Sequence, residues 1–206
     1  LNLTKISFIP LWHTVYHEYS RAYGMFVFLH TIHITRTLNS SLLFYLRAIG
    51  MHITQGIIPN AWVQSSFWLS ASPDLNAYFQ KVALGLKTYA RDFALAGVAL
   101  RPPVLNVTNI RTGWVYQVPG TMIPYPPFSF PSVLSSGWLA ADGRIAYLFT
   151  NVANQSIAFD FSIDLKQEGA PNEPRIIYEV QDGSIRQLDI YMGSPKTIKV
   201  SVAPLE

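Results

Sequence analysis

The sequence predicts an α/β first half followed by a small antiparallel β-sandwich, and three observations support this fold class. Residues 6–15 are mostly apolar or aromatic, which is typical of a strand buried on both faces of a parallel sheet. Residues 73–96 carry apolar side chains at helical spacing. After residue 131 the chain consists of short β-type runs separated by turn signals; the runs are residues 132–140, 144–152, 156–165, 175–181, 184–192 and 197–204.

The chain opens on residues typical of a buried strand, so we expect it to be the end of a larger protein. Its 206 residues are 50% hydrophobic, which is enough for a substantial core. Charged residues make up only 13%, against about 25% in an ordinary soluble domain. We therefore expect a weakly charged surface, or one partly covered by structure that precedes Leu1.

The charge pattern and the apolar segments argue against several partners. The net charge is +3, but the Lys and Arg residues of the first half occur singly, so we expect no nucleic-acid partner. The apolar residues 25–34 are about half of the roughly 20 that span a bilayer, so we expect no membrane span. Residues 1–24 lack the features of a signal peptide. N-glycosylation triplets nevertheless favour an extracellular or secretory location; they begin at Asn2, Asn39, Asn106 and Asn154.

Two helices are expected in the first half. The shorter one covers residues 39–49. The longer one runs from Pro73 to about Ala96, because Ser72 is a good N-cap and proline is favoured at the first helical position. Gly97 is expected to end this helix in the left-handed conformation.

The second half is predicted to be all-β. Residues 106–130 are rich in proline and are expected to form a linker, which is followed by an antiparallel β-sandwich over residues 131–206. Asp142-Gly143 and Asp182-Gly183 each lie between two β-type runs, and this dipeptide is a strong signal for a tight hairpin.

The residues best suited to chemistry follow the first predicted strand. Glu18 is the only glutamate before residue 168, and it lies beside His17. If the strand is parallel and belongs to a barrel, its carboxyl end faces the active-site mouth. Aromatic rings stack on the apolar faces of sugars, and carboxylates and amides bind sugar hydroxyls, so we expect a carbohydrate site. Its expected substrate-binding residues are Trp12, His13, Tyr16, Trp62 and Gln64.

Other interpretations of these residues remain open. Glu18 could form a surface ion pair with Arg21 or Arg47, and the aromatic cluster that contains Trp62 could belong to the core. His13 and His17 have a spacing suited to metal ligands, but His17-Glu18 lacks the second histidine of the helical zinc motif, so we expect no metal. Phosphate-binding loops and nucleophile elbows are absent from the sequence, and we expect no cofactor. Cysteine is also absent, which excludes disulfides.

Several longer segments resemble a known family. They are "IPLWHTVYHEYSRAYG", "GMHITQGIIPNAWVQSSFW", "ALAGVALRPPVL" and "PSVLSSGWLAADGRIAYLFTNVANQSIAFDFSIDL". Together they resemble the C-terminal part of large glycoside-hydrolase-like proteins, in which a (β/α) barrel known only as a domain of unknown function precedes a β-sandwich. The resemblance implies that residues 1–105 are the end of such a barrel and that most of the barrel lies upstream of Leu1.

Two functions follow as hypotheses. In the first, the chain is the C-terminal fragment of a glycoside hydrolase, in which Glu18 and His17 are the catalytic candidates and the sandwich supports the barrel. The resemblance then implies that residues 1–206 alone are inactive, because the other catalytic groups would lie on missing strands. In the second, the chain is a non-catalytic carbohydrate-binding or structural interaction module, and its aromatic residues belong to the core.

Overall fold

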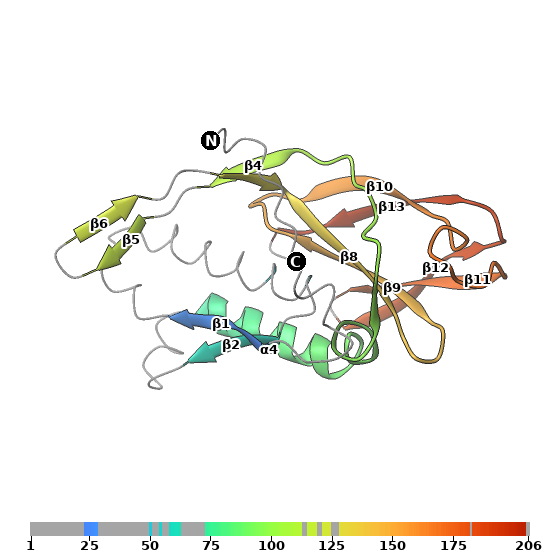
Figure 1. The fold of residues 1–206 in the computed structure, drawn as a ribbon, viewed down its shortest axis with the longest axis horizontal. Coiled ribbons are helices and arrows are strands. Elements are labelled where there is room, and N and C mark those ends of the chain that lie inside the picture. The colour runs from blue at the N-terminus through green and yellow to red at the C-terminus, as the bar shows by residue number, and fades with distance from the viewer. Residues whose placement is uncertain are drawn as a thin grey trace.

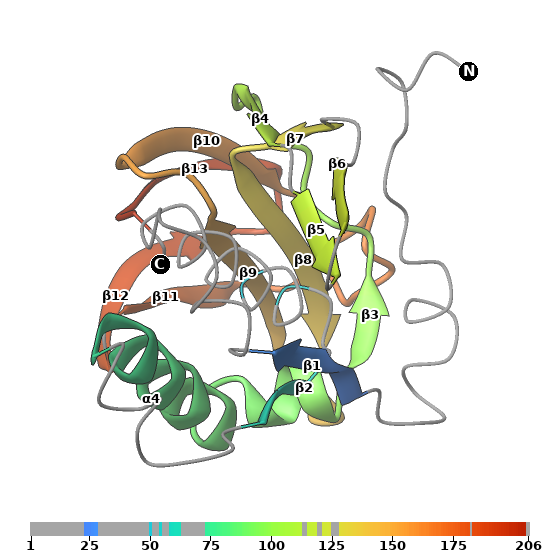
Figure 2. The ribbon, with the colours of Figure 1, turned by 90° about the vertical axis from the view of Figure 1, so that its left-hand side faces the viewer.

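A computed structural model describes residues 23–28, 50, 54, 58–62, 73–112, 115–118, 121–124, 128–181 and 183–204 (Figure 1). Most of the described strands are antiparallel and helical segments are few, so the predicted fold class is confirmed only as a β-rich second half, and the described strands close no barrel. Strands of the second half dominate the molecule, and helix α4 lies along one side of it (Figures 1 and 2).

Six strands account for residues 133–202, and they match the β-type runs of the sequence. They are β8 (Val133–Leu139), β9 (Ile145–Asn151), β10 (Ile157–Ile163), β11 (Arg175–Gln181), β12 (Ser184–Tyr191) and β13 (Lys196–Val202). The antiparallel pairs are β8 with β9, β11 with β12, and β10 with β13. Gly143 and Gly183 have φ values of 84° and 79°, so the two predicted Asp-Gly hairpins are confirmed.

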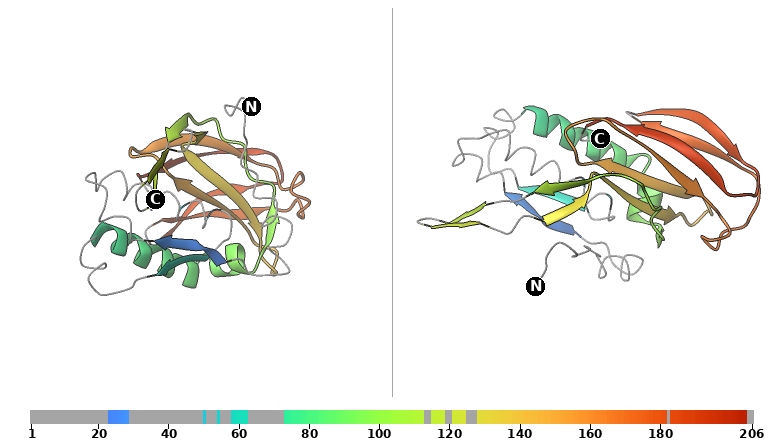
Figure 3. Two further views of the ribbon diagram at one scale, coloured as in Figure 1. Left: turned by 60° about the vertical axis from the view of Figure 1, so that its left-hand side comes forward. Right: turned by 90° about the horizontal axis from the view of Figure 1, so that it is seen from above.

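Aromatic rings from two sheets fill the core. On β9, the ring of Phe149 lies 5.1 Å from that of Phe159 and 4.9 Å from that of Phe161, both on β10. Along β10 the side chains alternate between buried and exposed, so one face of the β10–β13 pair packs inward and the other faces solvent. Figure 3 shows the sheet of β8 and β9 and the pair of β10 and β13 from two further directions.

The buried side chain of Asn151 links the end of β13 to the turn after β9 through hydrogen bonds. Its Nδ2 donates to the carbonyl oxygens of Gln155, Val202 and Ala203 at 2.8, 2.9 and 3.0 Å, and its Oδ1 accepts from the Ala153 N–H at 2.9 Å. The amide therefore satisfies backbone groups at the end of β13, where the strand ladder stops.

The long helix is shorter than its sequence pattern predicts. Helix α4 covers Pro73–Lys87, a turn follows, and a separate π-helical turn, η3, covers Arg91–Leu95. The Leu84 carbonyl accepts both the backbone N–H and the hydroxyl of Thr88, and the Ala90 N–H reaches back to the Gly85 carbonyl at 2.9 Å. A single helix to Ala96 was therefore a wrong prediction, because the backbone hydrogen bonds change from a four-residue to a five-residue spacing after Thr88.

Gly97 does follow η3, but for a different reason from the one predicted. It is not among the described glycines with positive φ. A Cβ at this position would lie 2.6 Å from the Phe93 oxygen and 2.7 Å from the Leu139 oxygen. Glycine is needed because two backbone segments pass too close for any side chain.

The proline-rich segment contains strands. Its described part forms β4 (Asn109–Thr112), β5 (Val115–Val118), β6 (Thr121–Pro124) and β7 (Phe128–Pro131). The pairs β4–β7 and β5–β6 are both antiparallel and together form a ribbon that projects from the main body (Figure 1). In addition, β3 (Val98–Leu100) pairs with β8, so a strand before the predicted linker joins a sheet after it.

The first half contains a parallel strand pair. Strands β1 (Tyr23–Phe28) and β2 (Ile58–Trp62) pair in parallel, and Gly50 and Thr54 between them are helical. Among the described residues these two strands form a sheet of their own and close no barrel. The predicted strand at residues 6–15 and the predicted helix at 39–49 lie outside the described residues.

Candidate functional site

Only one of the predicted site residues lies within the described part of the chain. Trp62 is the last residue of β2, and its backbone pairs with that of Phe28, the last residue of β1. The remaining predicted residues, Trp12, His13, Tyr16, His17, Glu18 and Gln64, lie outside the described residues.

The edge at Phe28 and Trp62 is the carboxyl edge of the parallel pair. In parallel sheets and barrels, ligands and substrates bind at this edge, because the loops that leave the strands gather there. Trp62 ends its strand at this edge and Gln64 follows it by two residues in sequence, and their role in sugar binding stays a prediction.

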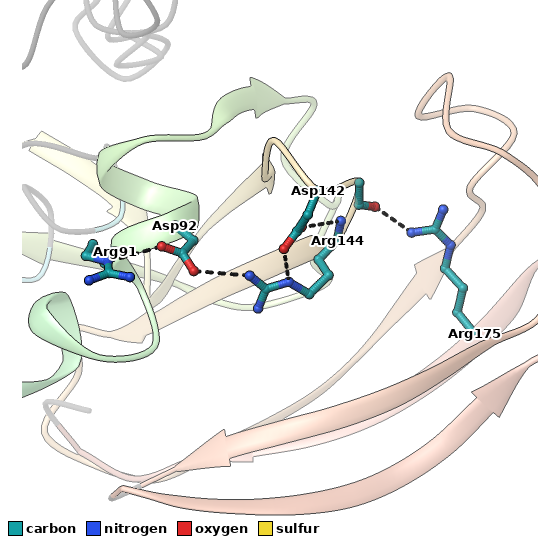
Figure 4. Close-up of polar contacts among 6 residues, drawn as sticks. Arg91, Asp92, Asp142, Arg144 and Arg175 are labelled. Carbon is teal, nitrogen blue, oxygen red and sulfur yellow. Dashed lines mark hydrogen bonds and ion pairs between the residues drawn. The ribbon is translucent and has the colours of Figure 1, made fainter.

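A network of charged side chains joins η3 to the β8–β9 hairpin (Figure 4). Asp92 accepts hydrogen bonds from Arg91 Nε and Arg144 Nη2, each at 3.1 Å. Arg144 Nε also donates to Asp142 Oδ2 at 2.7 Å, and its guanidinium lies 5.1 Å from the centre of the Phe93 ring. On the far side of the hairpin, Arg175 Nη1 donates to the Gly143 carbonyl at 2.6 Å.

The electrostatics of this network suit a structural role. Hydrogen bonds from Arg91 and Arg144 lower the pKa of Asp92, and the backbone and side chain of Arg144 lower the pKa of Asp142. Both carboxyl groups are therefore ionised at neutral pH and neutralised by arginine, whereas a general acid needs a raised pKa. These ion pairs hold η3 against the hairpin between β8 and β9.

A second group of titratable side chains lies near Tyr147. Burial raises the pKa of the Glu168 carboxyl, Arg101 lowers it, and the charge of Asp164 raises it. Burial also raises the pKa of the Tyr147 phenol, with further contributions from the negative charges of Glu168 and Asp164. Perturbed pKa values of this kind occur at functional sites. However, both carboxyls come from one turn, whereas the pair in a glycosidase flanks the scissile bond from two sides.

Sequence reasoning missed an exposed apolar face on the β11–β12 hairpin. We call it the hairpin face, and it consists of Ile176, Tyr178, Val180, Ile185, Gln187 and Ile190. The signal was present in "RIIYEVQ", where large apolar residues alternate with charged or polar ones. The run is predicted as a strand, but its sequence alone does not show which set of its side chains faces solvent.

Groups of three or more residues suited to hold a metal ion are not found among the described residues. The helices in the same part of the chain include none that is long and apolar enough to cross a membrane. Comparisons of this chain with protein families, with curated proteins and with solved structures find no match.

Proposed function

We propose that this chain is the C-terminal part of an extracellular glycoside-hydrolase-like protein that acts on a carbohydrate. In this proposal residues 1–105 are the end of a (β/α) barrel, and residues 131–206 form a sandwich that supports it. The observation that carries the proposal is the parallel β1–β2 pair, which has helical residues between its strands and Trp62 at its carboxyl edge.

The roles of the site residues follow from the chemistry of sugars. Glu18 and His17 bind or polarise the glycoside, because a carboxylate and an imidazole can hold hydroxyls and exchange protons. The aromatic residues Trp12, Tyr16 and Trp62 supply surfaces for the apolar faces of the sugar rings, and His13 and Gln64 bind hydroxyls. The remaining acid and nucleophile belong to barrel strands upstream of Leu1.

Hydrolysis of a panel of aryl glycosides by the native-length protein tests this proposal. Glu18→Gln is expected to lower kcat/KM at least about 100-fold, because general acid–base groups contribute that much or more. Glu168→Gln, which alters a carboxyl in the second half, is the matched control and is expected to retain activity. An absence of hydrolysis with every glycoside, or full activity of Glu18→Gln, would contradict the proposal.

The hairpin face favours a second candidate, a non-catalytic carbohydrate-binding or interaction module. Such a module needs an exposed recognition surface but no catalytic carboxylates. Sequencing the native protein upstream of Leu1 separates the two candidates. Strand–helix repeats with carboxylates at strand ends would support the hydrolase, and a sequence without such repeats would support the non-catalytic module.

A further inference from the structure

Two of the N-glycosylation triplets of the sequence lie within the described part of the chain. One is Asn106-Val107-Thr108, in the segment between β3 and β4, and the other is Asn154-Gln155-Ser156, between β9 and β10. The triplets that begin at Asn2 and Asn39 lie outside the described residues. A glycan is bulky and hydrated, so the folded protein can carry one only where the acceptor side chain is open to solvent.

Both triplets meet this condition. Asn106 and Thr108 are exposed in a segment that belongs to no helix or strand, and Asn154, Gln155 and Ser156 are all exposed in the turn that follows β9. Surface connections of this kind tolerate large additions, because no strand ladder has to open around them.

The amide groups of the two acceptor asparagines are also available. Neither Asn106 nor Asn154 is joined through its side chain to another described residue by a hydrogen bond. Asn151 and Asn172 are different, because their Nδ2 atoms donate to the carbonyl oxygens of Val202 and Gly193 at 2.9 and 2.8 Å. A glycan on either of these two nitrogens would disturb such bonds, and neither asparagine begins an acceptor triplet.

Backbone hydrogen bonds place the two triplets at the same end of one sheet. The Ser132 N–H donates to the Thr108 carbonyl, and the Val152 N–H donates to the Ser132 carbonyl, both at 2.9 Å. Ser132 immediately precedes β8, and Val152 immediately follows β9. Asn106 and Asn154 each lie two residues along the chain from one end of this hydrogen-bonded row, so both acceptors lie where β8 begins and β9 ends.

We propose that Asn106 and Asn154 are N-glycosylation sites and that their glycans cover this end of the sheet. The co-reactant is an oligosaccharide linked to a lipid through pyrophosphate. Each Nδ2 forms a bond to the anomeric carbon of the oligosaccharide and loses a proton, while the bond from that carbon to the pyrophosphate oxygen breaks and the lipid pyrophosphate leaves. The inference rests on the extracellular location in the proposed function, and it adds that protein partners bind elsewhere on the molecule.

Peptide mass mapping of the native-length protein, isolated from the cells that make it, tests the inference. The peptides are compared before and after treatment with a peptide N-glycanase in water labelled with oxygen-18, which converts each glycan-bearing asparagine into a labelled aspartate. We expect this conversion at Asn106 and at Asn154. Asn109, an exposed asparagine outside any triplet, is the internal control and is expected to stay unconverted.

Substitution of the hydroxyl residues separates the sites. In the native-length protein made by the same cells, Thr108→Ala and Ser156→Ala are each expected to reduce the intact mass by one glycan, because each removes the hydroxyl that completes its triplet. Thr108→Ala keeps the backbone carbonyl that binds Ser132, so the fold is expected to stay native. Asn109→Gln is the matched control and is expected to keep both glycans.

Two outcomes would overturn the inference at a given site. One is an asparagine whose peptide carries no glycan and is not converted, and the other is a glycan that persists after its triplet has lost the hydroxyl. Failure of the inference leaves hydrolysis of aryl glycosides intact, whereas failure of the proposed hydrolase removes hydrolysis and leaves both glycans in place.

Discussion

Arg144 connects segments that are distant in sequence, because its guanidinium bonds to Asp142 two residues away and to Asp92 on η3. The sequence predicts the hairpin that carries it, since Asp142-Gly143 is a local turn signal. It does not predict the pairing with Asp92, because single charges scattered along a chain give no indication of which will meet. The same holds for Tyr178, whose exposure depends on the register of its partner strand.

The carboxyls of this network make stability depend on pH. Their folded-state pKa values lie below the ordinary value of 3.8, so they stabilise the fold above that pH and lose this contribution as pH falls through the folded values. We expect the double variant Asp92→Asn, Asp142→Asn to melt below the wild type at pH 6, and the difference to close between about pH 4 and pH 2. Thermal unfolding monitored by circular dichroism across this range measures the difference.

Salt provides the control for this prediction. Exposed ion pairs are screened, so 1 M KCl is expected to reduce the difference in melting temperature at pH 6. A difference that is the same at pH 6 and pH 2.5 would show that the two substitutions act through something other than charge.

At the scale of elements, the β-type runs and the turn signals between them located the strands of the second half, from β8 to β13, to within a residue or two. The sequence did not predict the strands β4 to β7 of the proline-rich segment, which was expected to be a linker. Pro124 and Pro131 are the last residues of β6 and β7, and a strand tolerates proline at its end because few ladder donors are lost there. Helical spacing of apolar residues likewise continues past the end of α4, since this spacing does not show where the backbone hydrogen bonds change from four-residue to five-residue steps.

Two glycines of this region are expected to respond oppositely to substitution. Gly97→Ala places a Cβ against two backbone oxygens and is expected to lower the free energy of unfolding by about 1–3 kcal/mol, as overpacking does. Gly85→Ala lies in α4 with nothing within 4 Å of the added Cβ, and is expected to raise it by about 0.5–1 kcal/mol. Urea unfolding of both variants measures these changes. Equal effects of the two substitutions would mean that helix propensity, rather than the close approach at Gly97, decides the outcome.

At the scale of the molecule, the first and last of the three predicted segments are joined by direct contacts. Thr54 and Thr150 share a hydrogen bond of 2.8 Å between their hydroxyls, both buried, and β3 extends the sheet of β8 and β9. The sequence does predict a parallel unit before an antiparallel one, because each leaves a distinct pattern of apolar residues. It cannot show that β3, which precedes the predicted linker, joins the sheet of β8 and β9, since that pairing depends on contacts between distant residues. The proposed sugar site stays a prediction, because whether its residues lie together also depends on contacts between distant parts of the chain.

Hydrogen–deuterium exchange of the native-length protein, with and without a neutral oligosaccharide that it binds, tests the central claim most directly. The account predicts slower exchange in peptides that contain Glu18 and in peptides that span Trp62 and Gln64, because the sugar would occupy the carboxyl edge of the parallel pair. Unchanged exchange in those peptides, with protection confined to β11 and β12 or found nowhere, would contradict a carbohydrate site at that edge.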